Sequence, residues 1–320
     1  MDSVRAFTKS ALERLAHLDF DVIHAHDWMT YPAALQLRMV VRRPVVLHVH
    51  STAFDRGGSR MIGGQLGRER GTIASVERAG VRTADAVCAV SEYTKGVLME
   101  HYGADPESVH VVHNALTPED APRAVRKSTS SSGGPPTALF LGRLTRQKGV
   151  GFLLRAAALV LETHPTARFL IAGDGEERAR LIETVAELGL AGRVFFLGSI
   201  SDEAKREAYG AADVFVLPSI SEPFGLTPLE ALMEGTPVVL TTTAGVREVL
   251  PSAPAVEPWD VRAMADAILA VFDSRGQAGG HAETLVQRGQ RDLGSLSWGR
   301  SAEALESALR MAVQSAGVSL

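Results

Sequence analysis

The chain has a single cysteine in its 320 residues, Cys88, so no disulfide can form within it. Cys88 stands in the apolar run 86–90, which is typical of a small residue in a buried strand rather than of a reactive thiol. The N-terminus lacks the uninterrupted apolar core of a signal peptide, and no apolar run is long enough to span a bilayer. We therefore expect a cytoplasmic protein with no transmembrane segment.

The chain also has no excess of positive charge, with 33 Lys and Arg against 37 Asp and Glu. The net charge of -4 argues against a nucleic-acid surface, and no block rich in Lys and Arg marks a patch for anionic membranes. Hydrophobic residues make up 45% of the chain and charged residues 22%, which is enough to bury two cores of ordinary domain size. We expect a globular chain of two domains that does not bind nucleic acid.

Short apolar runs alternate with helical patterns along both halves of the chain, which favours an α/β fold with parallel sheets covered on both faces. The runs predict strands at residues 22–24, 44–49, 86–90, 109–112, 137–141, 167–172, 194–197, 214–217 and 237–240. Helical patterns cover residues 31–40, 67–83 and 93–101 in the first half. A polar stretch rich in Ser, Gly and Pro at residues 128–136 predicts the linker between domains 1–130 and 131–296.

Residues 222–230 place two carboxylates, Glu222 and Glu230, on either side of a glycine turn and a helix start. Gly225 permits close approach of the backbone to a ligand, and free N–H groups at the start of the run 226–233 can face phosphate oxygens. Glu222 and Glu230 can accept hydrogen bonds from hydroxyls at opposite ends of an elongated ligand. An ordinary loop with two solvated glutamates is the alternative, so a second motif is needed to decide.

That second motif is the basic turn 142–149, which follows the strand 137–141 and precedes a helical pattern. Arg143 offers a planar fork of donors and Lys148 a mobile point charge, two complementary ways to neutralise a diphosphate. The turn is not a P-loop, because GxxxxGK[ST] is absent. The two motifs together favour a site for a sugar nucleotide.

These two motifs resemble the donor site of retaining glycosyltransferases of the GT-B group, family 4 in particular. The resemblance extends to the glycogen-synthase-like branch through the segments 21–28, 48–56, 89–95 and 171–175. It implies two Rossmann-like domains facing a cleft, with residues 297–320 forming a helix that crosses back to the first domain. It also implies a hexosyltransferase that moves glucose from ADP- or UDP-glucose to an α-glucan or other sugar acceptor.

The resemblance further implies roles for individual residues. Arg143 and Lys148 would stabilise the departing diphosphate, so neither a metal nor a cofactor is expected. Glu222 would hold sugar hydroxyls, Glu230 the ribose, and His50 the sugar near its reactive carbon. The remaining residues expected to bind the donor nucleotide are Gly142, Gly173, Gly198, Phe224, Gly225, Leu226 and Thr227.

Two departures from the family pattern affect these expectations. Such enzymes open with a strand and a Gly-rich loop, and residues 1–21 contain neither, so we expect an incomplete first domain. Ala53 stands where relatives are expected to carry Glu. A donor-binding remnant or regulatory protein without turnover is therefore an alternative function, and a sugar-nucleotide 2-epimerase is another.

Two His-x-His pairs raise the possibility of a metal site. His24 and His26 share one face of a strand by the period-two rule, as do His48 and His50. A metal hydrolase would need a third and fourth ligand, and the strand ends further along the chain offer no convincing ones. The sequence therefore predicts no metal.

Overall fold

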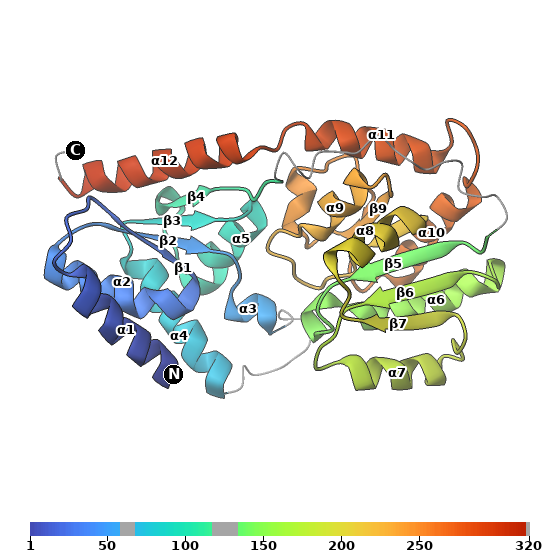
Figure 1. Cartoon of the computed structure of the whole chain (residues 1–320), viewed down its shortest axis with the longest axis horizontal. Coiled ribbons are helices and arrows are strands. Elements are labelled where there is room, and N and C mark those ends of the chain that lie inside the picture. The colour runs from blue at the N-terminus through green and yellow to red at the C-terminus, as the bar shows by residue number, and fades with distance from the viewer. Residues whose placement is uncertain (58–67, 117–133, 318–320) are drawn as a thin grey trace. The chain divides into compact units, whose positions relative to one another are not determined.

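The computed structural model describes residues 1–57, 68–116 and 134–317, and the chain forms two compact units (Figure 1). The first unit consists of Met1–Ala115 and Trp298–Leu320, and the second of Leu116–Ser297. The boundary predicted at residue 130, together with most of the linker 128–136, lies outside the described residues.

A sheet of four parallel strands in the order β1-β2-β3-β4 forms the centre of the first unit. Its strands are β1 (Ile23–His26), β2 (Val45–Val49), β3 (Ala86–Ala89) and β4 (Val109–Val111). The helices of the unit are α1 (Asp2–Leu15), α2 (Asp27–Val41), α3 (Ala53–Arg56), α4 (Arg68–Thr83), α5 (Glu92–Val97), the π-helix η2 (Leu98–Tyr102), the 3-10 turn η3 (Pro106–Ser108) and α12 (Trp298–Ser315).

Alternate residues of each strand face two separate cores. One core joins Val45, Leu47 and Val49 to residues of α2 and α4, and the other joins Val46 and Cys88 to residues of α12. Figure 1 shows α12 running along one side of this sheet. Cys88 is fully buried, as predicted, and burial raises the pKa of its thiol to about 12.

The second unit contains six parallel strands in the order β10-β9-β8-β5-β6-β7. They are β5 (Thr137–Leu141), β6 (Arg168–Ala172), β7 (Val194–Gly198), β8 (Val214–Val216), β9 (Val238–Thr241) and β10 (Ala255–Val256). The helices are the 3-10 turn η5 (Arg146–Lys148), α6 (Val150–Thr163), α7 (Arg178–Glu187), α8 (Asp202–Ala211), α9 (Thr227–Met233), the 3-10 turn η6 (Gly245–Glu248), α10 (Val261–Asp273) and α11 (His281–Leu293).

Helices cover both faces of this second sheet, which explains why its strands are apolar on both sides. Phe140, Val214 and Val239 face a core shared with α6 and α10. On the opposite face the ring of Phe215 contacts Tyr209 of α8, with ring centroids 5.6 Å apart. Chain order reverses between neighbouring strands β5 and β8, and the carboxyl ends of two such strands are where α/β sheets bind ligands.

The predicted strands are confirmed with shifts of one or two residues at their ends, and β10 is an additional strand of two residues. The predicted helix 93–101 is instead divided into α5 and the π-helix η2. In α12, Ala308 and Ala312 pack against the sheet, whereas Met311 is 40% exposed. Among the described residues, no helix combines the length and apolar character needed to cross a membrane.

Candidate functional site

Both predicted ligand motifs follow the two strands that flank the reversal of chain order in the second unit. The basic turn 142–149 begins where β5 ends, and the segment 222–230 follows β8 and leads into α9. Parallel strands present their carboxyl ends at the same edge of a sheet. The two motifs therefore lie together, although they are far apart in sequence. The carboxyl edge of this sheet therefore carries both motifs.

Three of the predicted glycines tie the loops at this edge together. The N–H of Gly142 donates to the carbonyl of Ala172, and the N–H of Gly173 donates to the carbonyl of Gly198, at 3.0 and 2.7 Å. Gly173 has φ of +126°, and a Cβ there would lie 1.9 Å from the carbonyl oxygen of Gly142. Only glycine fits such a contact, so the loops after β5, β6 and β7 pack backbone against backbone.

The basic turn is attached in the same way to the chain that leaves β8. Gly149 has φ of +65°, and a Cβ at this position would lie 1.9 Å from the carbonyl oxygen of Pro218. The Nε2 of Gln147 donates to the carbonyl of Ser221 at 2.9 Å, and the carbonyl of Gln147 accepts from the N–H of Ile220 at 2.8 Å. The turn and the segment after β8 thus form one rigid piece.

A charged pair joins the two motifs. The Nζ of Lys148 lies 2.5 Å from Oε2 of Glu222, and the side chains are 17% and 9% exposed. The hydroxyl of Ser219 donates to the same Oε2 at 3.1 Å. The backbone of Glu222 is held by an N–H···O bond to Thr243 and by a bond from Gly245 to its carbonyl, so its carboxylate has a defined direction.

Glu230 lies in the first turn of α9 and is held by residues of α8 that sequence reasoning missed. Its Oε2 accepts from the hydroxyl of Tyr209 at 2.7 Å, and its Oε1 lies 3.6 Å from the Nζ of Lys205. Burial, and then the neighbouring carboxylate, raise the pKa of Tyr209, so its hydroxyl stays protonated and donates. Neither Tyr209 nor Lys205 stands in a motif, and only their spacing of four residues on one helix face could have paired them with a common target.

The other predicted residues of the second unit differ in exposure. Arg143 is exposed, and among the described residues its guanidinium has no ion-pair partner. Phe224 is 2% exposed and Leu226 is 42% exposed, so Phe224 offers a ligand its backbone rather than its ring. Gly225, with φ of +103°, and Thr227, the first residue of α9, lie between Glu222 and Glu230.

His50 belongs to the first unit, at the carboxyl end of β2. Its N–H donates to Oδ1 of Asp27 at 2.9 Å, and its Nε2 lies 2.9 Å from Nδ1 of His26, so one of these two ring nitrogens donates to the other. Asp27 has φ of +56°, an unusual value for a residue other than glycine, which it adopts directly after β1. His50 is therefore positioned from both its backbone and its ring.

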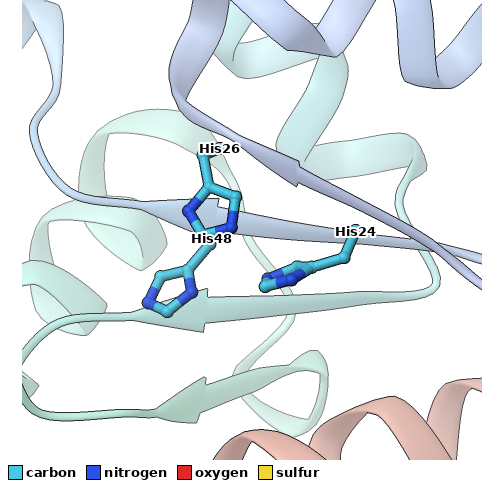
Figure 2. A group of neighbouring side chains, drawn as sticks. All are labelled: His24, His26 and His48. Carbon is cyan, nitrogen blue, oxygen red and sulfur yellow. The ribbon is translucent and has the colours of Figure 1, made fainter.

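The first unit also brings together three histidines that the sequence argument did not combine. One ring nitrogen from each of His24, His26 and His48 lies within 4.8 Å of the others, and Figure 2 shows the three rings gathered beside β1 and β2. The sequence argument looked for a third and fourth ligand at strand ends further along the chain, whereas the structure groups three nitrogens from the two His-x-His pairs themselves. The parallel register pairs His26 with His48 and brings the ligand from the neighbouring strand.

Comparison with known proteins agrees with the fold. The family model of Glycosyltransferase Family 4 matches residues 3–120, and that of Glycosyl transferases group 1 matches residues 123–292. The chain therefore belongs to the family 4 glycosyltransferases of the group 1 type, and its fold is GT-B, with two Rossmann-like domains.

Two relatives illustrate the similarity in sequence. An uncharacterized glycosyltransferase of Methanocaldococcus jannaschii is 34% identical over 72% of this chain and 60% of its own length. The glycogen synthase of Mycobacterium tuberculosis is 31% identical over 84% of this chain and 64% of its own length. The chain thus spans less than two thirds of the length of these curated relatives.

Two solved structures share the fold. Sucrose-phosphate synthase from Thermosynechococcus elongatus aligns with a TM-score of 0.81 and 24% identity, over 98% of this chain and 79% of that one. HepE of Anabaena, solved in complex with UDP-glucose, aligns with a TM-score of 0.69 and 22% identity, over 95% of this chain and 82% of that one. At this level of identity the likeness establishes the architecture.

Proposed function

We propose that the chain is a retaining hexosyltransferase that takes glucose from ADP- or UDP-glucose and transfers it to a glycan or other sugar acceptor. The observation that carries the proposal is the Lys148–Glu222 pair at the carboxyl ends of β5 and β8. It places a cation suited to a diphosphate beside a carboxylate suited to sugar hydroxyls, at the edge where this type of sheet binds nucleotides. Membership of the glycosyltransferase family and the UDP-glucose complex of HepE support the same donor class.

The two cations act on the leaving group. As the bond from the sugar to the diphosphate breaks, negative charge grows on the diphosphate oxygens, and donors already in position stabilise it. Lys148 is held by the rigid turn around Gly149, whereas the side chain of Arg143 is exposed and free to close on the ligand. With two cations present, this step proceeds without a divalent ion.

Glu222 and Lys148 exchange partners when the donor binds. Without a ligand each neutralises the other. A bound donor supplies the phosphate oxygens that Lys148 needs and the sugar hydroxyls that Glu222 needs, so both groups remain satisfied in the occupied site. This exchange favours the intact donor over the free nucleotide, since only the intact donor satisfies both.

Glu230 accepts hydrogen bonds from the ribose. Tyr209 occupies Oε2, and the 31% exposure of the side chain leaves the carboxylate accessible on one side. The weak 3.6 Å contact with Lys205 leaves Oε1 available as an acceptor. Glu222 lies before α9 and Glu230 in its first turn, which suits a ligand with sugar rings at both ends.

Retention follows from the family mechanism rather than from a protein nucleophile. The acceptor attacks on the face that the leaving group occupies, and the departing diphosphate takes the acceptor's proton. His50, at the end of β2, assists by holding the sugar near its reactive carbon. Its hydrogen bonds to Asp27 and His26 support a positioned side chain.

The test begins with a thermal-shift screen of ADP, UDP and their glucose conjugates, because a ligand that binds only the folded form raises the melting temperature. The best donor is then incubated with glucan acceptors, and the products are analysed for anomeric configuration. We expect one donor to stabilise the protein and a product that keeps the donor's configuration. A nucleotide sugar converted to its 2-epimer without an acceptor, or donor binding with no transfer, would contradict the proposal.

Arg143→Ala with Lys148→Ala should nearly abolish both binding and transfer, whereas His50→Ala should abolish transfer while free-nucleotide binding stays unchanged. Exposed Arg180, which pairs only weakly with Glu177 at 3.7 Å, supplies the matched control Arg180→Ala. If the double variant kept full affinity for the diphosphate, the basic turn would not be the donor site.

A further inference from the structure

Three histidines of the first unit lie on one face of neighbouring strands. His24 and His26 are two residues apart in β1, and the parallel register places His48 of β2 directly beside His26. The ring centroids are 4.4 Å apart for His24 and His26, 5.1 Å for His26 and His48, and 5.5 Å for His24 and His48. In Figure 2 the rings of His24 and His26 both point toward that of His48.

The two inner rings carry buried nitrogens without partners. Nε2 of His24 and both ring nitrogens of His48 are shielded from solvent, and within the described part of the chain none of them has a hydrogen-bond partner. His48 as a whole is only 6% exposed. A buried polar atom left unsatisfied costs about 1–3 kcal/mol, and a fold rarely retains three of them in one place without a use.

These rings are also in the protonation state that a metal requires. Burial, and then repulsion from neighbouring histidines, lower the pKa of His24 to about 4 and that of His48 to about 3. The pKa of His26 is lowered by the same causes. Neutral imidazoles offer lone pairs to a cation and no charge to an anion, so the cluster does not suit a phosphate.

We propose that His24, His26 and His48 form a binding site for a divalent transition-metal ion of the zinc type, separate from the donor site of the second unit. Three imidazoles with one open position are a familiar ligand set for Zn²⁺. Tetrahedral coordination at about 2.0–2.1 Å separates ligand nitrogens by about 3.3 Å. The present limit of 4.8 Å therefore requires the rings to close by about 1.5 Å at most, which side-chain rotation supplies.

His26 and His50 give this site an entrance and an outer contact. His26 is exposed, whereas His24 is half-buried and His48 is buried, so an ion enters past His26. The contact between Nδ1 of His26 and Nε2 of His50 leaves Nε2 of His26 to bind the ion. With the ion on Nε2, Nδ1 carries the proton and donates to His50, as metal-bound histidines donate to their outer partners. Metal binding thereby orders His50, which makes the metal a regulator of that side chain.

The experiment uses the full chain with no affinity tag, treated with EDTA and dialysed. Co²⁺ is titrated while its visible absorption is recorded, because the intensity of the d–d bands distinguishes four-coordinate from six-coordinate ions. Zn²⁺ is then added as competitor, and its stoichiometry and dissociation constant are measured by calorimetry. Neither measurement involves a nucleotide sugar, so the result is independent of the proposed transferase activity.

Two ligand variants, one variant of the outer contact and one control test the site. His24→Gln and His48→Val should each weaken Zn²⁺ binding by at least 100-fold, and His50→Gln by the roughly 10- to 100-fold typical of an outer-shell change. His17→Gln, which removes an exposed histidine of the same unit, is the matched control and should bind Zn²⁺ like the parent.

Folding is checked separately, because a variant that fails to fold would lose metal for a trivial reason. His48→Val removes two unsatisfied nitrogens and places an apolar side chain in the same space. Its metal-free melting temperature should therefore equal or exceed that of the parent. The parent should gain several degrees on adding Zn²⁺, and the variant should gain none. One four-coordinate Co²⁺ per chain that is lost in the ligand variants supports the proposal. Binding that is absent in the parent, or unchanged in His24→Gln and His48→Val, overturns it.

Discussion

Lys148 and Glu222, 74 residues apart in sequence, meet in an ion pair of 2.5 Å at the carboxyl edge of the second sheet. The hydrogen bonds of the Gln147 side chain to Ser221 and of its carbonyl to Ile220 hold the two segments together, and with them both side chains. In the absence of a ligand, the cation and the carboxylate of the proposed donor site neutralise each other. A ligand must therefore compete with Glu222 for Lys148.

Breaking this pair from the carboxylate side should separate the free nucleotide from the intact donor. In Glu222→Gln, Lys148 no longer has a competing anion, so affinity for free UDP should be unchanged or higher. Affinity for UDP-glucose should fall, because the sugar loses its charged acceptor. Lys148→Ala should weaken the binding of both ligands by about 10- to 100-fold, the effect of losing one charge-assisted hydrogen bond. Calorimetry measures the affinity for both ligands, and Lys9→Ala, at an exposed position, is the control. If Glu222→Gln lost affinity equally for UDP and UDP-glucose, the proposed exchange of partners would be contradicted.

Glu230 should affect the nucleotide itself. Glu230→Gln removes the charged acceptor proposed for the ribose and should weaken the binding of free UDP by about 10-fold or more. Tyr209→Phe keeps the carboxylate but removes the donor 2.7 Å from Oε2, so its effect should be smaller. Glu187→Gln, at an exposed position of α7, is the control. Calorimetry with UDP measures these affinities. If Glu230→Gln bound UDP as tightly as the parent, Glu230 would not bind the ribose.

Gly173 should be intolerant of even one methyl group. Its φ of +126° and the 1.9 Å separation between an added Cβ and the carbonyl oxygen of Gly142 require the backbone to move in Gly173→Ala. We expect a loss of several kcal/mol in the free energy of unfolding, together with weaker nucleotide binding.

The control for this change is Gly151→Ala in α6. An added Cβ there meets nothing within 4 Å, and alanine in a helix is more favourable than glycine, by up to about 1 kcal/mol. Urea denaturation of the three proteins gives the comparison. If Gly173→Ala were as stable as Gly151→Ala, the tight contact between the two loops would be unimportant.

Glu77 in the first unit should give a measurable pH dependence of stability. It is 3% exposed, its carboxylate accepts from the N–H of Ala53 at 2.9 Å, and it pairs with Arg56 at 2.7 Å. Burial outweighs these contacts and raises its pKa above 4.5. The folded protein thus holds the proton more tightly than the unfolded chain, so the carboxyl's contribution to stability is fully present below pH 4.5 and falls as pH rises through the folded pKa.

Glu77→Gln cannot titrate, so its stability should lose this component of the pH dependence, with a slope difference of at most about 1.4 kcal/mol per pH unit. Urea denaturation at a series of pH values upward from 4 measures it. Glu187→Gln, exposed on α7, should follow the parent curve. Parallel curves for Glu77→Gln and the parent would show that Glu77 does not change protonation between the folded and unfolded states in this range.

Some features of the fold were predictable because they depend on local patterns. The strand 137–141 was predicted with its observed bounds, since an apolar run between polar turns determines a buried strand locally. The strand β10 was missed because two residues carry no periodicity. The π-helix of residues Leu98–Tyr102 was missed because its hydrogen bonds, and not its side-chain pattern, distinguish it from the α-helix before it.

The sequence by itself determined the family, the two motifs of the proposed donor site and the alternation of strands and helices, because each depends on contiguous residues. Tertiary structure alone decided which separated residues meet. Lys148 reaches Glu222 because β5 and β8 are neighbours in the sheet, and Tyr209 reaches Glu230 because α8 lies beside α9. His48 joins His24 and His26 because a parallel register sets it beside His26. Strand order and register arise from packing across the whole sheet, and no local spacing encodes them.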